Sequence, residues 1–413
     1  MIRNLIHFWV GQRLPLEHIY VGSDRKPKSL FPLVRFYLRL FFIHPLKRRI
    51  AKYYLVLLKH FTELKVIAIT GSAGKTTTKE MVTSILRQKG KTVSSYANID
   101  PIYNIPSTIL KCRPTTRFLV LEMGVEYPGE MDFYLWLAKP DIAVLTNIFP
   151  THTQFFKDTA GVFREKSKLV RSLSKSDIAV LNSDDAKVRS LKNEIKSKII
   201  LYGVDGVVKA INRKLNSNMS TTYTLIYDKN KINVHLPIVG EQFISNSLAA
   251  ISVGIAADIP LSDIVKGISR YEKPKHRMEI RKLKNGATLI DDAYNNNPQA
   301  ALEALKTFEN LSANGKRIIV FGDMLELGKK QDDHHKDIGK KIADLDVDYL
   351  LCVGSLSEKT AVIVRKKLGK NKVDWVKSSE GVYPLLKKRI TAGSFILIKG
   401  SRSIRLDKVT SLL

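Results

Sequence analysis

The sequence predicts an α/β protein in which two domains, each with a mostly parallel sheet, follow a short helical region. After residue 64, short apolar runs typical of buried strands alternate with longer helical patterns. A charged stretch broken by proline, residues 271–276, divides this part of the chain into two blocks. We therefore expect a basic amphipathic N-terminal region over residues 1–63, a central domain over 64–272 and a C-terminal domain over 273–413.

The composition is that of a globular protein with a strong positive charge. Among 413 residues, 68 lysines and arginines outnumber 39 aspartates and glutamates, which gives a net charge of +29. Such a balance favours an anionic partner: a nucleic acid, a membrane surface or a phosphorylated substrate. Because no nucleic-acid-binding motif with interleaved aromatic residues is present, we expect no nucleic-acid partner. Cys112 and Cys352 have no metal-ligand spacing and indicate a reducing cytoplasm.

The first 63 residues are rich in aromatic, aliphatic and basic side chains. Residues 29–43 are apolar with arginine at intervals, Pro45 is expected to end this helix, and residues 47–61 form a second helical pattern. No cleavable signal pattern is present, and no run of about 18 uncharged apolar residues predicts a membrane-spanning helix. Two interpretations remain open: the helices lie in a membrane interface, or they pack against the following domain. The expected location is cytoplasmic, with membrane association as one of these alternatives.

The central domain opens with a strand, a tight turn and a helix N-terminus. Apolar residues 66–69 run into Thr70-Gly71-Ser72-Ala73-Gly74-Lys75-Thr76-Thr77-Thr78. The glycines allow the backbone N–H groups to point at an anion, the lysine supplies a positive charge for phosphates, and the next threonine offers a hydroxyl to Mg²⁺. The strict pattern G-x-x-x-x-G-K-[ST] is not met, because Ile69 stands at its first glycine. The stretch still predicts a nucleoside-triphosphate site.

Two further strands of this domain end in residues that suit a ligand site. The apolar run 118–122 ends in Glu122, and the run 142–148 precedes His152. Because parallel strands bring their carboxyl ends to one edge of a sheet, we expect both side chains to lie beside the phosphate loop.

The remaining pattern completes two sheets. The central domain is expected to contain a helix from about residue 161, a strand over 178–182, a small antiparallel patch within 200–240 and a helix from about Asn246. In the C-terminal domain, strands separated by helical patterns are expected at 287–290, 317–321, 349–353 and 395–398. This alternation predicts a Rossmann-like domain with a mostly parallel sheet.

Six motifs, taken in order, resemble those of the Mur ligase family of ATP-dependent, amide-forming enzymes of peptidoglycan precursor synthesis. They are the phosphate loop, Glu122-Met123-Gly124 with Gly129-Glu130, Asn147-Ile148 with His152, Asp291 to Pro298, Gly322 to Gly328, and Lys399 to Arg402. The resemblance covers the chain from about Leu64 to its C-terminus. It is most similar to the branch that joins D-Ala-D-Ala to a UDP-N-acetylmuramoyl-tripeptide, so these two molecules, or related cell-wall precursors, are the expected partners.

The resemblance implies a reaction and a set of catalytic residues. A substrate carboxylate would attack the γ-phosphate of ATP to give an acyl phosphate, from which an amine displaces phosphate. The catalytic residues it implies are Lys75, Glu122, His152 and Lys166. Thr76 and Glu122 would hold one Mg²⁺, and His152 a second together with Lys166. A cationic lysine cannot ligate a metal, so this last role depends on carbamylation of Lys166.

The resemblance also implies the nucleotide contacts. The phosphates would lie on residues 71–77, and the remaining contacts would be Asn246 to adenine, Asp292 to ribose, Arg277 to ATP, and Tyr294, Asn295 and Asn297 in the closed cleft. Closure of the C-terminal domain would exclude water from the acyl phosphate.

The chain departs from the family pattern on the substrate side. Residues 1–63 are shorter than the family's N-terminal UDP-binding domain and contain none of its motifs. Asp100, Pro101 and Asn104 interrupt the expected substrate loop over residues 98–106. Two alternatives therefore stand beside the leading hypothesis: a Mur-type ligase with a lipid-linked or polyamino acid acceptor, and a nucleotide-dependent binding protein that has lost ligation.

Overall fold

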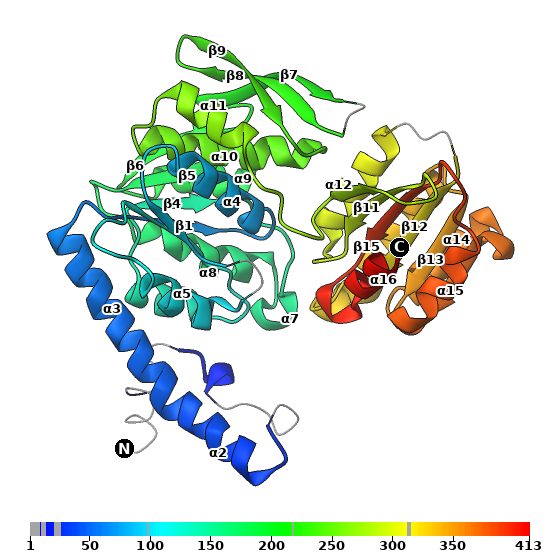
Figure 1. Cartoon of the computed structure of the whole chain (residues 1–413), viewed down its shortest axis with the longest axis horizontal. Helices are drawn as coiled ribbons and strands as arrows, with labels where there is room; N and C mark the ends of the chain where they lie inside the picture. Colours follow the sequence, from blue (N-terminus) through cyan, green and yellow to red (C-terminus); the bar gives the residue numbers. More distant parts are fainter. Residues whose placement is uncertain (1–8, 10–13, 20–25, 97–98, 217–218, 312–314) are drawn as a thin grey trace.

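The computed structural model describes residues 9, 14–19, 26–96, 99–216, 219–311 and 315–413. Residues 65–236 build a nine-stranded sheet and residues 279–399 a six-stranded sheet, each with its own helices (Figure 1). The predicted α/β fold class is confirmed. Asn98 of the expected substrate loop, and part of the N-terminal region, lie outside the described residues.

The central sheet is parallel over most of its width. Its strands are β1 (Lys65–Thr70), β2 (Thr92–Ser94), β3 (Phe118–Glu122), β4 (Ile142–Leu145), β5 (Ile178–Asn182), β6 (Lys198–Tyr202), β7 (Val208–Leu215), β8 (Thr221–Tyr227) and β9 (Asn230–Leu236). They lie in the order β2-β3-β1-β4-β5-β6-β7-β8-β9, with antiparallel pairing only from β7 to β9. The antiparallel patch expected within residues 200–240 is therefore an edge of this sheet.

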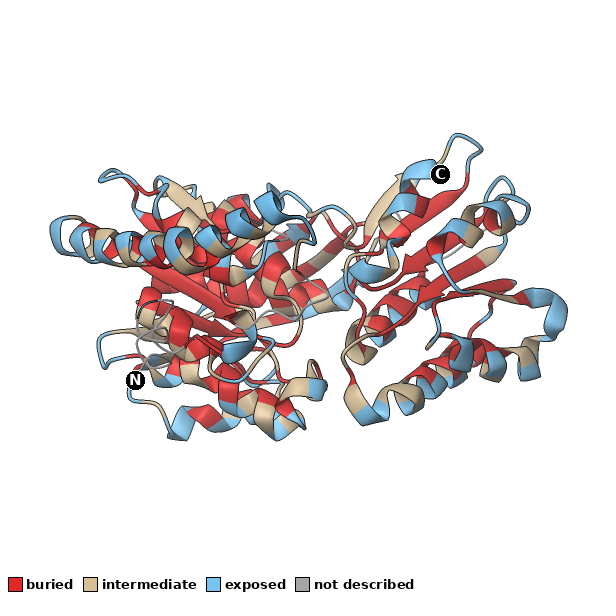
Figure 2. Cartoon of the chain, turned by 90° about the horizontal axis from the view of Figure 1, so that it is seen from below, coloured by how far each residue is buried: buried red, intermediate tan, exposed pale blue. Residues whose placement is uncertain are grey.

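Helices cover both faces of the central sheet. One group is α4 (Lys75–Leu86), α10 (Glu241–Ala256) and α11 (Leu261–Ser269); the other is α5 (Pro101–Ile109), α6 (Glu130–Leu137), α7 (Thr153–Phe156), α8 (Thr159–Arg171) and α9 (Ala186–Ser190). In β1, Ile67 and Ile69 belong to the core under the first group, and Val66 and Ala68 to the core under the second. This alternation has the period of two of a strand, and the strands are buried between the layers (Figure 2).

The C-terminal domain repeats this plan. Its strands are β10 (Glu279–Lys282), β11 (Thr288–Asp292), β12 (Arg317–Gly322), β13 (Tyr349–Val353), β14 (Val373–Val376) and β15 (Phe395–Lys399). Its helices are α12 (Pro298–Asn310), α13 (Gln331–Asp344), α14 (Glu358–Leu368), α15 (Val382–Lys387) and α16 (Leu406–Leu412). The order is β10-β11-β15-β12-β13-β14, and only β10 pairs antiparallel.

Short 3-10 turns occur in all three parts of the chain. They are η1 (Leu16–His18), η4 (Leu191–Asn193), η5 (Gly328–Lys330), η6 (Lys370–Lys372), η7 (Ser379–Gly381) and η8 (Arg402–Ile404).

The N-terminal region contributes one continuous helix instead of two. It comprises α2 (Leu30–Leu38), a π-helical turn η3 (Arg39–Ile43) and α3 (His44–Phe61). The expectation that Pro45 ends the first helix is wrong. Proline lacks the N–H that would bond to the carbonyl of Phe41, and the Nε1 of Trp9 donates to that carbonyl instead, at 2.6 Å. The wider π turn directly before Pro45 interrupts the regular hydrogen-bond ladder there.

Helix α3 packs on the central domain through one face only. Its buried side chains include Ala51, Leu55 and Leu58, which join the core beneath α5 and α6. Lys47 adds a hydrogen bond from Nζ to the Oγ of Ser107 on α5, at 2.8 Å. The packing interpretation therefore holds for this face of α3, whereas the opposite face stays exposed. In the described part of the chain, no helix is long and apolar enough to cross a membrane.

We expect His44 to make the protein less stable in acid. Burial, followed by the charges of Arg48, Lys47 and Arg39, lowers the pKa of His44 from 6.5 to about 4. The unfolded chain thus takes up a proton at a higher pH than the folded chain, so stability falls as the pH drops from 6.5 to 4. Because the ring is partly solvated, we expect His44→Gln to reduce this loss by about 1–2 kcal/mol.

Urea unfolding of the wild type and of His44→Gln across this pH range measures the effect. His60→Gln controls for the loss of a histidine on the exposed side of the same helix. Equal pH dependence of unfolding in His44→Gln and the wild type would contradict the prediction.

Candidate active site

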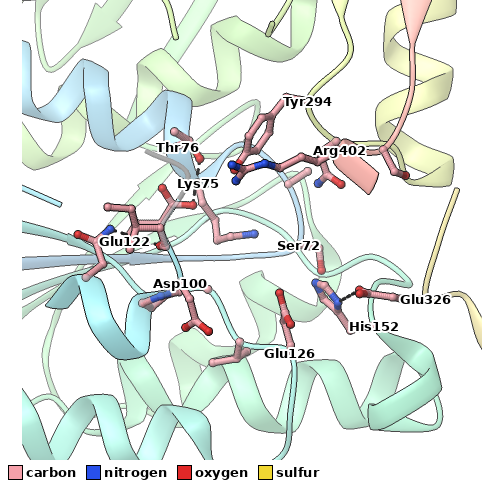
Figure 3. Close-up of a pocket in the computed structure, with 18 of the residues that line it drawn as sticks. Ser72, Lys75, Thr76, Asp100, Glu122, Glu126, His152, Tyr294, Glu326 and Arg402 are labelled. Carbon is pink, nitrogen blue, oxygen red and sulfur yellow. Dashed lines mark hydrogen bonds and ion pairs between the residues drawn. The ribbon is translucent and has the colours of Figure 1, made fainter. Parts of the chain in front are cut away.

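A cavity of about 390 Å³ lies between the two domains, at the carboxyl ends of β1, β3 and β4 (Figure 3). This is the sheet edge at which the sequence places a ligand site. From the central domain its walls include Ser72, Ala73, Gly74, Lys75, Thr76, Glu122 and His152. From the C-terminal side they include Arg277, Tyr294, Asn295, Glu326 and Arg402.

The turn after β1 has the geometry of an anion site. Gly71 and Gly74 have φ of 149° and 79°, which residues with a side chain rarely adopt. A Cβ on Gly74 would lie 2.3 Å from the Oδ1 of Asn246, so the close approach also requires glycine. Helix α4 then begins at Lys75 with no side-chain cap, and its N-terminal residues line the cavity. Uncapped N–H groups at a helix N-terminus fit the phosphates of a nucleotide.

Thr76 joins the two domains at this end of the cavity. Its hydroxyl lies 3.0 Å from the Oε1 of Glu122, and it accepts a hydrogen bond from the Nη2 of Arg277 at 3.1 Å. The guanidinium of Arg277 lies over the ring of Tyr294, 4.3 Å from its centroid. Hydroxyl and carboxylate oxygens are ligands that Mg²⁺ prefers, so Thr76 and Glu122 fit a magnesium ion beside bound phosphates.

Lys75 is the basic group of the phosphate loop. Its Nζ donates to the carbonyl of Gly71 at 2.9 Å, so the side chain folds back over the turn. Burial lowers the pKa of Lys75, and the nearby carboxylate of Glu122 opposes this shift. An anion bound in the loop would favour the ammonium form in the same way as Glu122.

His152 is held by a residue of the C-terminal domain. Its Nδ1 lies 2.5 Å from the Oε2 of Glu326, and this hydrogen bond lowers the pKa of Glu326. Both residues have positive φ, 53° and 63°, so each side chain projects from a tight turn. A second bond, from the Oγ1 of Thr153 to the carbonyl of Leu327 at 3.0 Å, joins the same two segments.

Lys166 is buried in α8, with 1% of its surface exposed. Burial, and then the charge of Lys75, lowers the pKa of Lys166 well below its usual value. The neighbouring Glu165 is directed elsewhere, because its Oε1 accepts the N–H groups of Gly129 and Met131, both at 3.0 Å. Lys166 therefore loses its proton more readily than an exposed lysine, and the unprotonated amine is the form that reacts with carbon dioxide.

The comparisons with known proteins agree with this site. The Mur ligase middle domain matches residues 69–254, and the domain described as "Mur ligase, glutamate ligase domain" matches residues 276–402. The chain belongs to the Mur ligase family. Family members are ATP-dependent ligases that form amide bonds, so the predicted family and enzyme class are confirmed.

Relatives and solved structures define the branch of Mur ligases that the chain is similar to. It is 35% identical to the UDP-N-acetylmuramoyl-tripeptide–D-alanyl-D-alanine ligase of Buchnera aphidicola subsp. Baizongia pistaciae, over 85% of this chain and 76% of that protein. The ligase of the same name from Bacillus subtilis is 30% identical, over 84% and 75%. A crystal structure of MurF from Acinetobacter baumannii has a TM-score of 0.81 and 28% identity, covering 90% of this chain and 80% of that one. MurF ligase from Thermotoga maritima in complex with ADP shares the fold, with a TM-score of 0.78, 23% identity and coverage of 95% and 86%.

Some residues that the sequence assigned to the Mur ligase site lie outside the cavity wall. They are Gly71, Thr77, Lys166, Asn246, Asp292 and Asn297. Asn297 caps α12 by accepting the N–H of Ala300 at 2.9 Å, and Asp292 pairs with Lys399 at 3.1 Å. Asn246 lies beneath Gly74, within reach of the phosphate loop. In this arrangement the structure gives Asn297 a helix-capping contact and Asp292 an ion pair.

Sequence reasoning missed one contact between this Mur ligase's N-terminal region and its cavity. Glu130, which lines the cavity, accepts the N–H groups of Glu126 and Tyr127 through Oε2. Its Oε1 lies 2.5 Å from the Nε2 of His18. Glu130 stands in a motif that the sequence singled out, but no pattern around His18 indicates this partner, because the contact joins residues 112 positions apart.

Proposed function

We propose that this Mur ligase joins D-alanyl-D-alanine to UDP-N-acetylmuramoyl-tripeptide in the cytoplasm, with ATP hydrolysis and an acyl-phosphate intermediate. The names of its relatives support the choice of substrates. The observation that carries the proposal is the meeting of the phosphate loop, Glu122 and Arg277 at the hydroxyl of Thr76. These groups come from separate segments of both domains and gather around the position that the γ-phosphate would occupy.

The main task of such a site is to bring two anions together. A substrate carboxylate must approach the γ-phosphate, and Lys75 and Arg277 supply positive charge on that side of the cavity. Mg²⁺ held by Thr76 and Glu122 would neutralise charge on the phosphates. Removal of the magnesium should therefore prevent phosphate transfer while leaving the protein folded.

The remaining nucleotide contacts complete the proposal. The phosphates would bind residues 71–77, adenine would contact Asn246, and ribose would contact Asp292. Tyr294, Asn295 and Asn297 would line the cleft once the domain 273–413 closes on the domain 64–272. The contact of His152 with Glu326 supports closure, because it already joins the two domains beside the cavity. Closure would keep water from the acyl phosphate.

His152 and Lys166 would serve a second magnesium ion. For Lys166 this requires a carbamate, which turns the amine into a carboxylate-like anion that a metal accepts. The burial of Lys166 and its lowered pKa support this modification, because only the unprotonated amine adds carbon dioxide.

A Mur-type ligase with a lipid-linked acceptor is the second candidate. The observation that favours it is the exposed apolar face of the N-terminal helix, whose α3 part packs on α5. Pro101 and Asn104 of α5 line the cavity and belong to the expected substrate loop. The N-terminal helix therefore packs on the wall of the cavity at which the acceptor is expected to bind.

The test measures phosphate release from ATP with UDP-N-acetylmuramoyl-tripeptide and D-Ala-D-Ala, each omitted in turn. We expect release only when both are present, and a pentapeptide product by mass spectrometry. ATP hydrolysis that needs neither substrate would contradict the proposal, and so would its absence with both. Release with a lipid-linked muramoyl-peptide but not with the UDP form would establish the second candidate.

A further inference from the structure

The helix formed by α2, η3 and α3 carries the largest exposed apolar surface of the described residues. Twelve of its large hydrophobic side chains are exposed, half of the 24 found in the whole described chain. They are Leu30, Phe31, Val34, Leu38, Phe42, Ile43, Leu46, Ile50, Tyr53, Val56, Leu57 and Phe61, and we refer to them as the outer face. Contiguous apolar patches of this extent on a protein surface mark interaction sites.

The outer face is a single stripe on the side away from the domain. Its members recur every three or four residues, which is the spacing of one face of a helix. In α3 the buried residues Ala51, Leu55 and Leu58 occupy the opposite side and pack on the central domain. Helix α2 has no buried residue and extends beyond the body of the domain (Figure 1).

The π turn η3 keeps the apolar stripe on one side of the helix from α2 into α3. A four-residue spacing drifts by about 40° per step around a helix with 3.6 residues per turn. From Leu30 through Val34, Leu38, Phe42 and Leu46 the chain keeps that spacing, and η3 lies in the middle of the run. Because a π turn contains more residues per turn, it takes back part of the drift. The apolar side chains of both helical halves therefore share one side.

The charges of this helix indicate what covers the outer face. Residues 30–61 contain seven lysines and arginines and no aspartate or glutamate. Two copies of the chain that met through this helix would bring the exposed Arg35 and Arg39 of both copies together, and the net charge of +29 adds further repulsion. A partner with an anionic surface and an apolar interior would attract the basic side chains and would also bury the apolar stripe. Lipid bilayers with anionic headgroups have this chemistry.

We propose that the outer face docks in the plane of an anionic lipid bilayer. The apolar stripe would enter the boundary between headgroups and acyl chains, and basic side chains such as Arg35 and Arg39, which are exposed, would reach the headgroups. With about 1.5 Å per residue, the helix offers roughly 48 Å of contact. The helix lies on the membrane and does not cross it, in agreement with the absence of a spanning helix among the described residues. This inference does not rest on the proposed ligase reaction.

The experiment is co-sedimentation of the full chain with vesicles of phosphatidylcholine alone and of phosphatidylcholine with phosphatidylglycerol. We expect binding to the anionic vesicles, with an affinity that falls as salt is raised, and little binding to the neutral ones. Removal of two exposed charges in Arg35→Gln/Arg39→Gln should weaken binding about twenty-five-fold, since each contributes roughly a five-fold effect. Removal of two apolar contacts in Phe42→Gln/Leu46→Gln should weaken it by at least about ten-fold.

A matched control changes exposed apolar residues elsewhere. Val204→Gln/Val362→Gln removes two such side chains from the rest of the surface and should bind as the wild type does. Circular dichroism of every variant checks that the fold is kept, since none of the changed side chains is buried.

Three results would overturn the proposal. The first is failure to sediment with anionic vesicles at any salt concentration, which would leave the outer face to other segments of the chain. The second is equal binding of Phe42→Gln/Leu46→Gln and the control. The third is a lipid-free dimer in sedimentation equilibrium that Phe42→Gln/Leu46→Gln abolishes, which would assign the outer face to a second copy.

Discussion

Lys75→Ala is expected to lower the turnover number for phosphate release by about 10³-fold or more. The ammonium of Lys75 lies inside the turn that would hold the phosphates. Because this group is buried, its charge interacts strongly with neighbouring charges. During attack on the γ-phosphate, the negative charge in this turn must be stabilised by a nearby positive charge, which is the ammonium of Lys75. Loss of this ammonium removes that stabilisation from the transition state, while most backbone contacts to the nucleotide remain.

Steady-state assays with saturating substrates measure the loss of turnover, and a thermal-shift assay measures whether ATP still binds. Together they separate an effect on the transition state from an effect on nucleotide binding. Lys75→Arg tests whether any positive charge suffices, and we expect it to remain strongly impaired because a guanidinium does not fit the space of an ammonium. Lys65→Ala, at the exposed start of β1, serves as the matched control. A Lys75→Ala protein within ten-fold of the wild type would show that this lysine does not act on the phosphates.

Local sequence patterns predicted the parts of this protein that local forces determine. The buried strand before the phosphate loop follows from a run of apolar residues, and the turn follows from Gly71 and Gly74, whose positive φ few other residues tolerate. Glu122 and His152 were placed beside the loop because parallel strands end at one edge. In each case a single segment, or one general rule of α/β sheets, was sufficient.

Contacts between distant segments could not be predicted in this way. His152 meets Glu326 across 174 residues, and Glu130 meets His18 across 112, so no spacing in the sequence relates the partners. The helix through Pro45 is a related case. The pattern around proline indicates a stop, but the carbonyl that proline leaves without a donor is satisfied by Trp9, far from it in sequence. Tertiary contacts outweighed the local signal.

Lys166→Ala is expected to abolish ligation, with turnover reduced by about 10³-fold or more. In the proposed modification the unprotonated amine of Lys166 would attack carbon dioxide, so that an N–C bond forms, one C=O bond becomes C–O⁻, and the amine releases a proton. The product is an anion in place of a neutral amine. Because burial lowers the pKa of Lys166, the amine stays unprotonated at lower pH than an exposed lysine. As the pH falls through this lowered pKa, protonation should remove the carbamate and the activity together.

Lys168 provides the matched control on the same helix. Burial alone would lower the pKa of Lys168, but hydrogen bonds with Asp132 and Glu165 outweigh it and raise the pKa, so this lysine stays cationic and cannot add carbon dioxide. With ¹³C-labelled bicarbonate, NMR should show a carbamate signal in the wild type and in Lys168→Ala but none in Lys166→Ala. Added bicarbonate should raise the activity of a carbon dioxide-depleted wild type and should not rescue Lys166→Ala. Wild-type turnover in Lys166→Ala would exclude the carbamate from the reaction, and a signal that persists in this variant would assign it to another amine.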